Sequence, residues 1–503
     1  MINQLQPALA VARGGVLDRP QPSASGASPV DTAGPTPPRW RTIGALAAVL
    51  GLGAAAFFLS SDDRTAIFEP AAEPAVAAAD LSLGSMYHVV DQVGARQLWA
   101  EGVTGAGVNV AVIDSGVAPV DGLLGDDKVV AAADFSTEAD APATAFVDTN
   151  GHGTHLAGII AGRETGADPE RAADHPEWFL GVAPDAGIVS VKVGDRTGAV
   201  RPGAIVAAVD WVIENAEAND IRVINLAVGT DSSLAYEQDA LAAAVERAWD
   251  AGIVVVTAAG NNGADARELA APANDPFVIA VAAAKATDDG FITPEWASSG
   301  DGVRNPDVSA PGAHIESLRA PGSDADVNHP EGYVDAETFK GSGSSQAAAV
   351  VSGLAALLLD ARPDLTNDQV KSLLSETATP LAGPASVAGA GLVDAVAADA
   401  APAPQAQQDW PRATASGPVG GAPFVSPIWS SATWSSATWS SATWSSATWS
   451  SATWSSATWS SATWSSATWS SATWSSATWS SATWSSATWS SATWSSATWS
   501  SAT

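Results

Sequence analysis

The 503-residue sequence contains no cysteine, and this absence removes three classes of site. Without thiols the chain has no disulfide framework, no cysteine-ligated zinc site and no cysteine nucleophile. The absence does not settle the cellular compartment, because exported proteins can do without disulfides.

Basic residues are scarce. The chain has 22 Lys and Arg against 54 Asp and Glu, which gives a formal net charge of −32 at pH 7. Such an acidic surface argues against nucleic acid as a partner and against adhesion to anionic lipid. It does not identify a substrate, since the same charge also suits solubility in salty surroundings.

One long uncharged apolar run, Thr42–Leu59, follows a leader, residues 1–41, that is rich in Pro, Ala, Gly and Ser and is typical of disordered chain. The run is long enough to cross a membrane, and Arg39 and Arg41 before it predict a cytoplasmic N-terminus. We therefore predict an uncleaved signal-anchor over 42–59. A cleaved signal peptide is the alternative, and a buried helix of a soluble protein is a third. The first two place the rest of the chain outside the cytoplasm, membrane-anchored or secreted.

Residues 86–400 alternate apolar runs of strand length with helical patterns, between an Ala/Pro/acidic linker at 60–85 and a Pro/Ala/Gly/Gln linker at 401–428. The strand-like runs include Val110–Ile113, Ile188–Val193, Arg222–Leu226 and Ile253–Ala258. This alternation predicts an α/β domain, a parallel β-sheet flanked by helices on both faces.

Three segments of this domain place polar residues at the ends of predicted elements. AVIDSG puts Asp114 at the C-terminal end of a strand, where catalytic groups of parallel sheets gather. GHGTHLAGIIAG puts His152 at a glycine-rich helix start, and GSGSSQAAAVVSG puts Ser345 where a tight loop enters a buried helix. Unpaired N–H groups there favour developing negative charge. Alone, each residue could be structural, as a turn aspartate, a core histidine or a helix cap.

The three segments resemble the signature motifs of the subtilases, the subtilisin-like serine peptidases, and they follow that family's order of Asp, His and Ser. The similarity extends from about Val89 to Val396. It implies a subtilisin-like fold and peptide-bond hydrolysis through an acyl-enzyme intermediate. In that chemistry Ser345 is the nucleophile, His152 is the base and then the acid, and Asp114 holds the imidazole.

The resemblance also implies the residues that bind substrate and oxyanion. Asn261 matches the side-chain donor of the oxyanion hole, with the Ser345 N–H as the second donor. The segment whose backbone would pair with an extended substrate is Ala227, Val228 and Gly229. A wall of the pocket for the residue before the cut is Ala258, Ala259 and Gly260, which predicts an open, uncharged pocket. As an alternative, Asn261-Asn262-Gly263 is only a turn.

Three residues beside the nucleophile depart from the commonest family pattern: Ser344 stands for Thr, Gln346 for Met and Ala349 for Pro. None of these changes removes a catalytic group. The chemistry requires no cofactor or metal. Family members often hold structural calcium, but acidic loops such as 121–127 lack a specific ligand spacing, so no metal site is assigned.

From Trp429 to Thr503 the pentapeptide WSSAT repeats without error. A period of five gives no single-faced helix and no single-faced strand. The composition favours a disordered tail, with a compact stacked repeat as the alternative. Regular exposed tryptophans predict an adhesive segment for cell-wall glycan, a membrane interface or another tail, and a solvated spacer is the plain alternative.

An exported endopeptidase acting on protein or peptide substrates is the leading interpretation. The first alternative is a catalytically silent surface-binding protein on a subtilase scaffold, which the intact set of Asp114, His152, Ser345 and Asn261 disfavours. The second is a serine esterase; its α/β-hydrolase version is weakened because no GxSxG motif surrounds Ser345.

Overall fold

The computed structural model describes residues 77–125, 128–230, 232 and 234–414, with residues 423–424 and the strand triplets of the repeat tail. The predicted leader at 1–41, the apolar stretch at 42–59 and most of the 60–85 linker lie outside the described residues. Pairs of residues between the tail triplets lie outside them as well.

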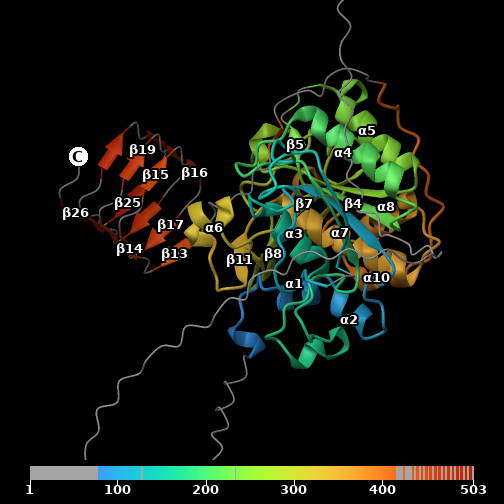
Figure 1. Cartoon of the computed structure of the whole chain (residues 1–503), viewed down its shortest axis with the longest axis horizontal. Helices are drawn as coiled ribbons and strands as arrows, with labels where there is room; N and C mark the ends of the chain where they lie inside the picture. Colours follow the sequence, from blue (N-terminus) through green and yellow to red (C-terminus); the bar gives the residue numbers. More distant parts are fainter. Residues whose placement is uncertain are drawn as a thin grey trace, which may run out of the picture. The chain divides into compact units, whose positions relative to one another are not determined.

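A parallel sheet forms the centre of the domain, as the sequence predicts (Figure 1). Its strands are β1 (Asn109–Asp114), β2 (Val129–Asp134), β3 (Gly187–Lys192), β4 (Ile221–Leu226), β6 (Val254–Ala258), β7 (Ile279–Thr287), β8 (Gly290–Ile292) and β9 (Val308–Pro311). The order is β2-β3-β1-β4-β6-β7-β8, with β9 beside β7, and only β8 runs antiparallel to its neighbour. The carboxyl ends of β1, β4 and β6 therefore share one edge.

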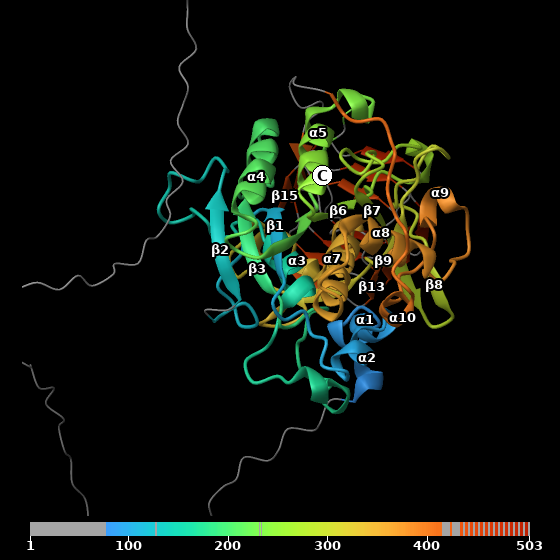
Figure 2. The same cartoon turned by 90° about the vertical axis from the view of Figure 1, so that its right-hand side faces the viewer.

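Helices cover both faces of this sheet. Figure 2 shows α3 (His152–Ala161) and α7 (Ser344–Ala361) on one face, and α4 (Pro202–Asn215) and α5 (Ala240–Asp250) on the other. The other helices of the described residues are α1 (Met86–Gln92), α2 (Ala95–Trp99), α6 (Asp324–Asn328), α8 (Asn367–Glu376), α9 (Ala385–Ala388) and α10 (Ala395–Ala400). In the described part of the chain, 3₁₀ turns lie at Ala78–Asp80, Pro169–Asp174, Tyr236–Gln238, Ala264–Ala266 and Pro330–Gly332.

Helix α7 is packed in the core of the domain, and this packing fixes the position of its first turn. It packs against β4, β6, β7 and α3, and its apolar residues Val350, Val351, Leu354 and Leu358 are fully buried. Among the described helices, α7 is the one long and apolar enough to cross a membrane, yet 89% of it is buried in the domain. Its apolar character therefore belongs to the core.

Two small pairings complete the domain. Strand β10 (Ile315–Leu318) pairs antiparallel with β11 (Thr338–Gly341), which leads directly into the loop before α7. Strand β5 (Gly229–Thr230) pairs antiparallel with β12 (Pro423–Phe424), an extended segment from the C-terminal region.

The first part of the predicted 401–428 linker is anchored on the domain. Residues 402–414 have no helix or strand. The Gln408 side chain donates to Phe277 O at 2.9 Å, and Arg412 pairs with Asp250 at 2.8 Å and lies over the Phe277 ring. These contacts hold the chain against the domain beyond the last helix.

The repeat tail has the stacked arrangement that the sequence offers as the alternative. Strands β13 to β26 are Thr-Trp-Ser triplets, from Thr433–Ser435 to Thr498–Ser500. Each of β13 to β22 pairs in parallel with the triplet four further on, so that Trp434 is in register with Trp454, and Trp454 with Trp474. Because every fourth triplet pairs, the triplets form four ladders, and the tryptophans occupy equivalent positions along each ladder.

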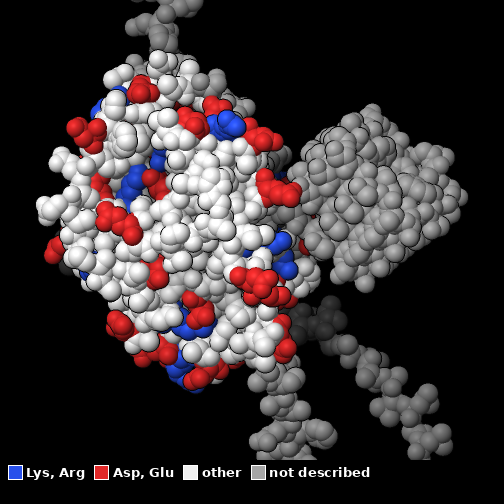
Figure 3. Space-filling view, turned by 180° about the vertical axis from the view of Figure 1, so that it is seen from behind, with Lys and Arg blue, Asp and Glu red and all other residues white. Residues whose placement is uncertain are grey.

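Acidic side chains are spread over the domain surface. On the face seen in Figure 3, Asp and Glu lie singly and in small groups around a broad uncharged area, with fewer Lys and Arg among them. This face carries no basic stripe of the kind that follows a nucleic-acid backbone.

Candidate active site

Asp114 and His152 form a buried pair at the carboxyl edge of the sheet. Asp114 is the last residue of β1, in the middle of the sheet, and His152 is the first residue of α3. The His152 Nδ1 lies 2.8 Å from Asp114 Oδ1 and 3.0 Å from Oδ2, and both side chains are fully buried. A carboxylate that holds Nδ1–H leaves Nε2 as the proton acceptor of the neutral ring.

A second carboxylate, Asp148, fixes the start of α3 against the end of β1. Asp148 Oδ1 accepts from Gly151 N at 2.7 Å, and Oδ2 accepts from Thr154 N at 2.8 Å, which satisfies first-turn donors of the helix. Asp148 Oδ1 also accepts from Ser115 Oγ at 2.9 Å, and Ser115 Oγ accepts from Gly153 N at 2.9 Å. Asp148 therefore couples the residue after Asp114 to the helix of His152.

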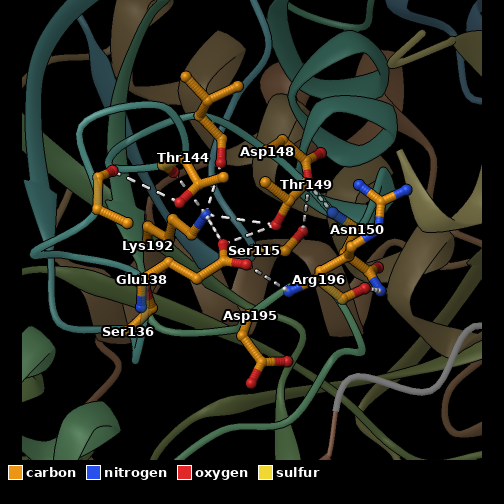
Figure 4. A network of polar contacts seen from close by, with 12 residues as sticks. Ser115, Ser136, Glu138, Thr144, Asp148, Thr149, Asn150, Lys192, Asp195 and Arg196 are labelled. Atoms are coloured by element: carbon orange, nitrogen blue, oxygen red, sulfur yellow. Dashed lines mark hydrogen bonds and ion pairs between the residues drawn. The ribbon is translucent and has the colours of Figure 1, made fainter. Parts of the chain in front are cut away.

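Lys192 holds the loop that carries Asp148 (Figure 4). It ends β3 in register with Asp114 and is fully buried. Its Nζ lies 2.6 Å from Glu138 Oε2, 2.6 Å from Val147 O and 3.0 Å from Thr144 O. The ammonium group binds all three oxygens and so connects the 138–149 loop to the sheet.

Replacing Lys192 by methionine is expected to lower the free energy of unfolding by about 3–5 kcal/mol, because it removes one partner of a buried ion pair and leaves Glu138 uncompensated. Urea denaturation followed by tryptophan fluorescence measures the change. The matched control is Arg247→Met, because Arg247 and Asp210 pair at 2.6 Å with 48% and 45% of their side chains exposed. Its effect should stay within about 1 kcal/mol. Equal effects of the two substitutions would contradict a structural role for Lys192.

Ser345 is the second residue of α7 and is 5% exposed. Its Oγ donates to Ala227 O at 3.4 Å, and no hydrogen bond joins it to His152 in this structure. The buried His152 Nε2 has no hydrogen-bond partner among the described residues. Since α3 packs against α7, the two helix starts lie on the same side of the sheet.

Asn261 follows β6, and its amide is oriented by the residue before the serine. Asn261 Oδ1 accepts from Ser344 N at 2.9 Å and from Ser344 Oγ at 3.0 Å, which turns Nδ2 toward Gly343. Ser344 Oγ in turn accepts from Gly260 N at 3.0 Å. The departure from Thr to Ser therefore keeps the hydroxyl that makes these contacts.

The predicted substrate-binding residues lie at the ends of neighbouring strands. Ala227 and Val228 follow β4 directly and are buried, and Gly229 begins β5. Ala258 is the last residue of β6, and Ala259 and Gly260 follow it. Gly260 has φ 113°, and a Cβ there would lie 2.8 Å from Ser298 Oγ, so the turn requires glycine.

His155, one helical turn after His152, makes a structural hydrogen bond. Its Nε2 donates to Phe339 O at 3.0 Å, and burial lowers the pKa of its imidazole to about 4. The ring therefore stays neutral at ordinary pH. No group of three or more His, Cys, Asp or Glu side chains that could hold a metal ion occurs among the described residues; Asp126 and Asp127 of the 121–127 loop lie outside them.

Sequence reasoning missed the roles of Asp148, Ser115 and Lys192. Lys192 is the one charged residue in the apolar strand GIVSVK, and a lone charge in a buried strand is a signal of an internal partner. Asp148 lies four residues before His152, the first residue of α3, at a distance from which a carboxylate can reach the first turn.

Comparisons with known proteins agree with this geometry. A sequence model described as "Subtilase family" matches residues 105–392. The chain is 37% identical to serine protease AprX of Bacillus subtilis (strain 168), over 54% of this chain and 61% of that protein, so it spans less than two thirds of that relative. It is 34% identical to subtilisin J of Geobacillus stearothermophilus, over 62% of this chain and 71% of the relative.

A third relative, the thermostable alkaline protease of Halalkalibacterium halodurans, is 32% identical over 60% of this chain and 70% of its own length. The matched interval contains β1, the α3 start, Asn261 and the α7 start. The chain therefore belongs to the subtilase family of subtilisin-like serine proteases.

Proposed function

We propose that this chain is an endopeptidase that hydrolyses peptide bonds through Asp114, His152 and Ser345 and an acyl-enzyme intermediate. The observation that carries the proposal is the fully buried Asp114–His152 pair, in which both carboxylate oxygens lie within 3.0 Å of His152 Nδ1. The other ring nitrogen, Nε2, has no hydrogen-bond partner among the described residues. This arrangement fixes the tautomer in which Nε2 can take a proton.

The steps follow from these positions. Ser345 Oγ turns from Ala227 O toward His152 Nε2, passes its proton there and attacks the carbonyl carbon of the substrate. Catalytic hydrogen bonds that are long without substrate commonly tighten when it binds. His152 then gives the proton to the leaving amine, which leaves the acyl group on Ser345. Water, deprotonated by the same imidazole, attacks the acyl carbon, and His152 returns the proton to Ser345 Oγ as the acyl product leaves. These proton transfers use side chains alone and no cofactor or metal.

The oxyanion formed on attack needs hydrogen-bond donors already in place. Asn261 Nδ2 and Ser345 N both lie beside the Cα of Gly343: a Cβ built there would be 3.2 Å and 3.6 Å from them. Ser344 holds the Asn261 amide in this orientation before substrate arrives, so little reorganisation is needed during reaction.

Backbone pairing along Ala227, Val228 and Gly229 is proposed to hold an extended substrate. The pairing of β5 with β12 supports this, because it shows that the Gly229 backbone accepts an extended strand. Ala258, Ala259 and Gly260 are proposed to form an open, uncharged wall beside it. No side-chain preference beyond this follows.

Casein digestion by the full chain, combined with hydrolysis of a simple ester, tests the proposal. Peptide products from casein are expected. Ester cleavage without peptide cleavage would favour the esterase, and neither activity would favour the silent binding protein.

We further propose that the chain works outside the cytoplasm, held at the membrane through 42–59 or released after cleavage. The arginines before this apolar run support the orientation. N-terminal sequencing of the mature protein separates the two cases: an N-terminus before Thr42 indicates the anchor, and one after Leu59 indicates a cleaved signal.

The WSSAT tail is proposed to be an adhesive segment that catalysis does not need. Truncation after Ile428 should leave specific activity near that of the longer chain and abolish its retention on a surface, because tryptophans recurring in register offer repeated contact sites. Purified proteins that lack residues 1–59, with and without the tail, are sedimented with cell walls, with lipid vesicles or alone. These arms separate glycan, membrane and self-association. Equal sedimentation of both proteins in every arm would reject the adhesive role.

A further inference from the structure

Gln346 follows the proposed nucleophile in α7, and its buried amide has no hydrogen-bond partner within the described part of the chain. Its side chain is fully buried, and neither Oε1 nor Nε2 is hydrogen bonded among the described residues. Native proteins pair nearly all buried polar groups, since an unpaired one costs free energy. A buried amide without a partner beside Ser345 therefore needs a reason, and a ligand that arrives during reaction supplies one.

Three polar atoms converge beside the Cα of Gly343. A Cβ built on this residue would lie 2.8 Å from Gln346 Oε1, 3.2 Å from Asn261 Nδ2 and 3.6 Å from Ser345 N. The last two atoms are the donors proposed for the oxyanion. The Gln346 amide therefore lies beside the same glycine as the two proposed donors.

The other end of this amide faces a second glycine. A Cβ on Gly341 would lie 2.7 Å from Gln346 Nε2 and 3.1 Å from His155 Cε1. Glycines at 341 and 343 therefore leave room for the amide on both sides. A half-turn of the amide about its last bond exchanges its oxygen and nitrogen with little change of shape and breaks no hydrogen bond of the described residues.

We propose that Gln346 is a third donor of the oxyanion hole: its Nε2–H turns toward the space beside Gly343 as negative charge develops on the substrate oxygen. The inference rests on the proposed function. The half-turn places Nε2 where Oε1 now lies, on the same side as Asn261 Nδ2 and Ser345 N. A neutral amide donor in this buried position stabilises that charge more than it stabilises the uncharged carbonyl, so it lowers the barrier.

The test compares wild type with Gln346→Met, which keeps the length of the side chain and removes the donor, and Gln346→Glu, which places an acceptor there. The wild type and both variants are assayed for kcat and KM on a peptide nitroanilide. They are also assayed for the Ki of a peptide aldehyde, which forms a tetrahedral adduct with the serine, and of the matching peptide alcohol, which does not.

Removing one oxyanion donor costs up to about 10²–10³ in rate, and we expect at least about a 10-fold loss of kcat for Gln346→Met. KM should be unchanged, aldehyde affinity should fall by a similar factor, and alcohol affinity should stay constant. Gln346→Glu should be slower still.

Measurements of stability separate the donor role from a role in packing. Because the amide has no hydrogen bond to lose among the described residues, Gln346→Met should unfold at the same urea concentration as wild type or a higher one. A role in packing would lower stability and activity together. Gln346→Met with kcat and aldehyde affinity within twofold of wild type would reject the donor role, and so would a kcat loss without a loss of aldehyde affinity. If the wild type itself cleaves no peptide and takes no serine label, the proposed function fails, and the donor role fails with it.

Discussion

Replacing Ser345 by alanine is expected to lower kcat for peptide hydrolysis by roughly 10⁶-fold, the scale of loss when the nucleophile of a serine protease triad is removed. The remaining side chains still bind substrate and an oxyanion, so a weak rate above the background reaction persists. The fold should be retained, because the substitution removes one hydroxyl whose hydrogen bond to Ala227 O is 3.4 Å long. Steady-state kinetics and the urea midpoint measure the two effects.

The matched control is Ser352→Ala, which removes another buried hydroxyl from the same helix. Ser352 Oγ lies 3.0 Å from Asn225 Oδ1 and 2.9 Å from Ala348 O, inside the core. The activity of the folded control should remain near that of wild type. Full turnover by Ser345→Ala would remove this residue from the mechanism.

Replacing Asn261 by alanine is expected to lower kcat by about 10²–10³-fold with little change in KM, because its amide acts mainly on the charge of the transition state. The structure supports this size of effect, since Ser344 holds the amide in place and its Nδ2 borders the same space as Ser345 N. Initial-rate kinetics on a peptide nitroanilide give both constants.

Asn262→Ala is the matched control for Asn261→Ala. Asn262 is exposed, and its contact with Ser298 Oγ uses the backbone N–H, which alanine keeps. The control should therefore leave kcat within about twofold of wild type, as surface changes away from a site usually do. A raised KM at normal kcat in Asn261→Ala would instead identify Asn261 as a substrate-binding residue.

The sequence predicts the sheet and the positions of the site because both depend on local patterns. Apolar runs at 110–113, 188–193 and 253–258 are long enough for a buried strand and too short for a helix, and they became β1, β3 and β6. Since parallel strands end at one edge, Asp114 and Asn261 could be expected to lie near each other. The Asp114–His152 contact then follows from where α3 begins.

Other features could not be predicted because they depend on contacts between distant residues. The ion pair of Lys192 with Glu138 joins residues 54 positions apart, and no spacing rule connects them. The composition of 401–428 is that of a linker, yet Gln408 and Arg412 find partners on the domain. In the tail, the regular structure depends on pairing between residues four repeats apart, such as Thr433 and Thr453.

The most direct test of the central claim is to treat the full chain with a fluorophosphonate and locate the adduct by mass spectrometry. An activated serine should be labelled at Ser345 in a one-to-one ratio, because the reagent reacts with a serine whose proton a neighbouring base accepts. Ser345→Ala should take no label, and His152→Ala should react far more slowly. An unlabelled wild type, or an adduct on another serine with Ser345 unmodified, would contradict the assignment of Ser345 as the nucleophile.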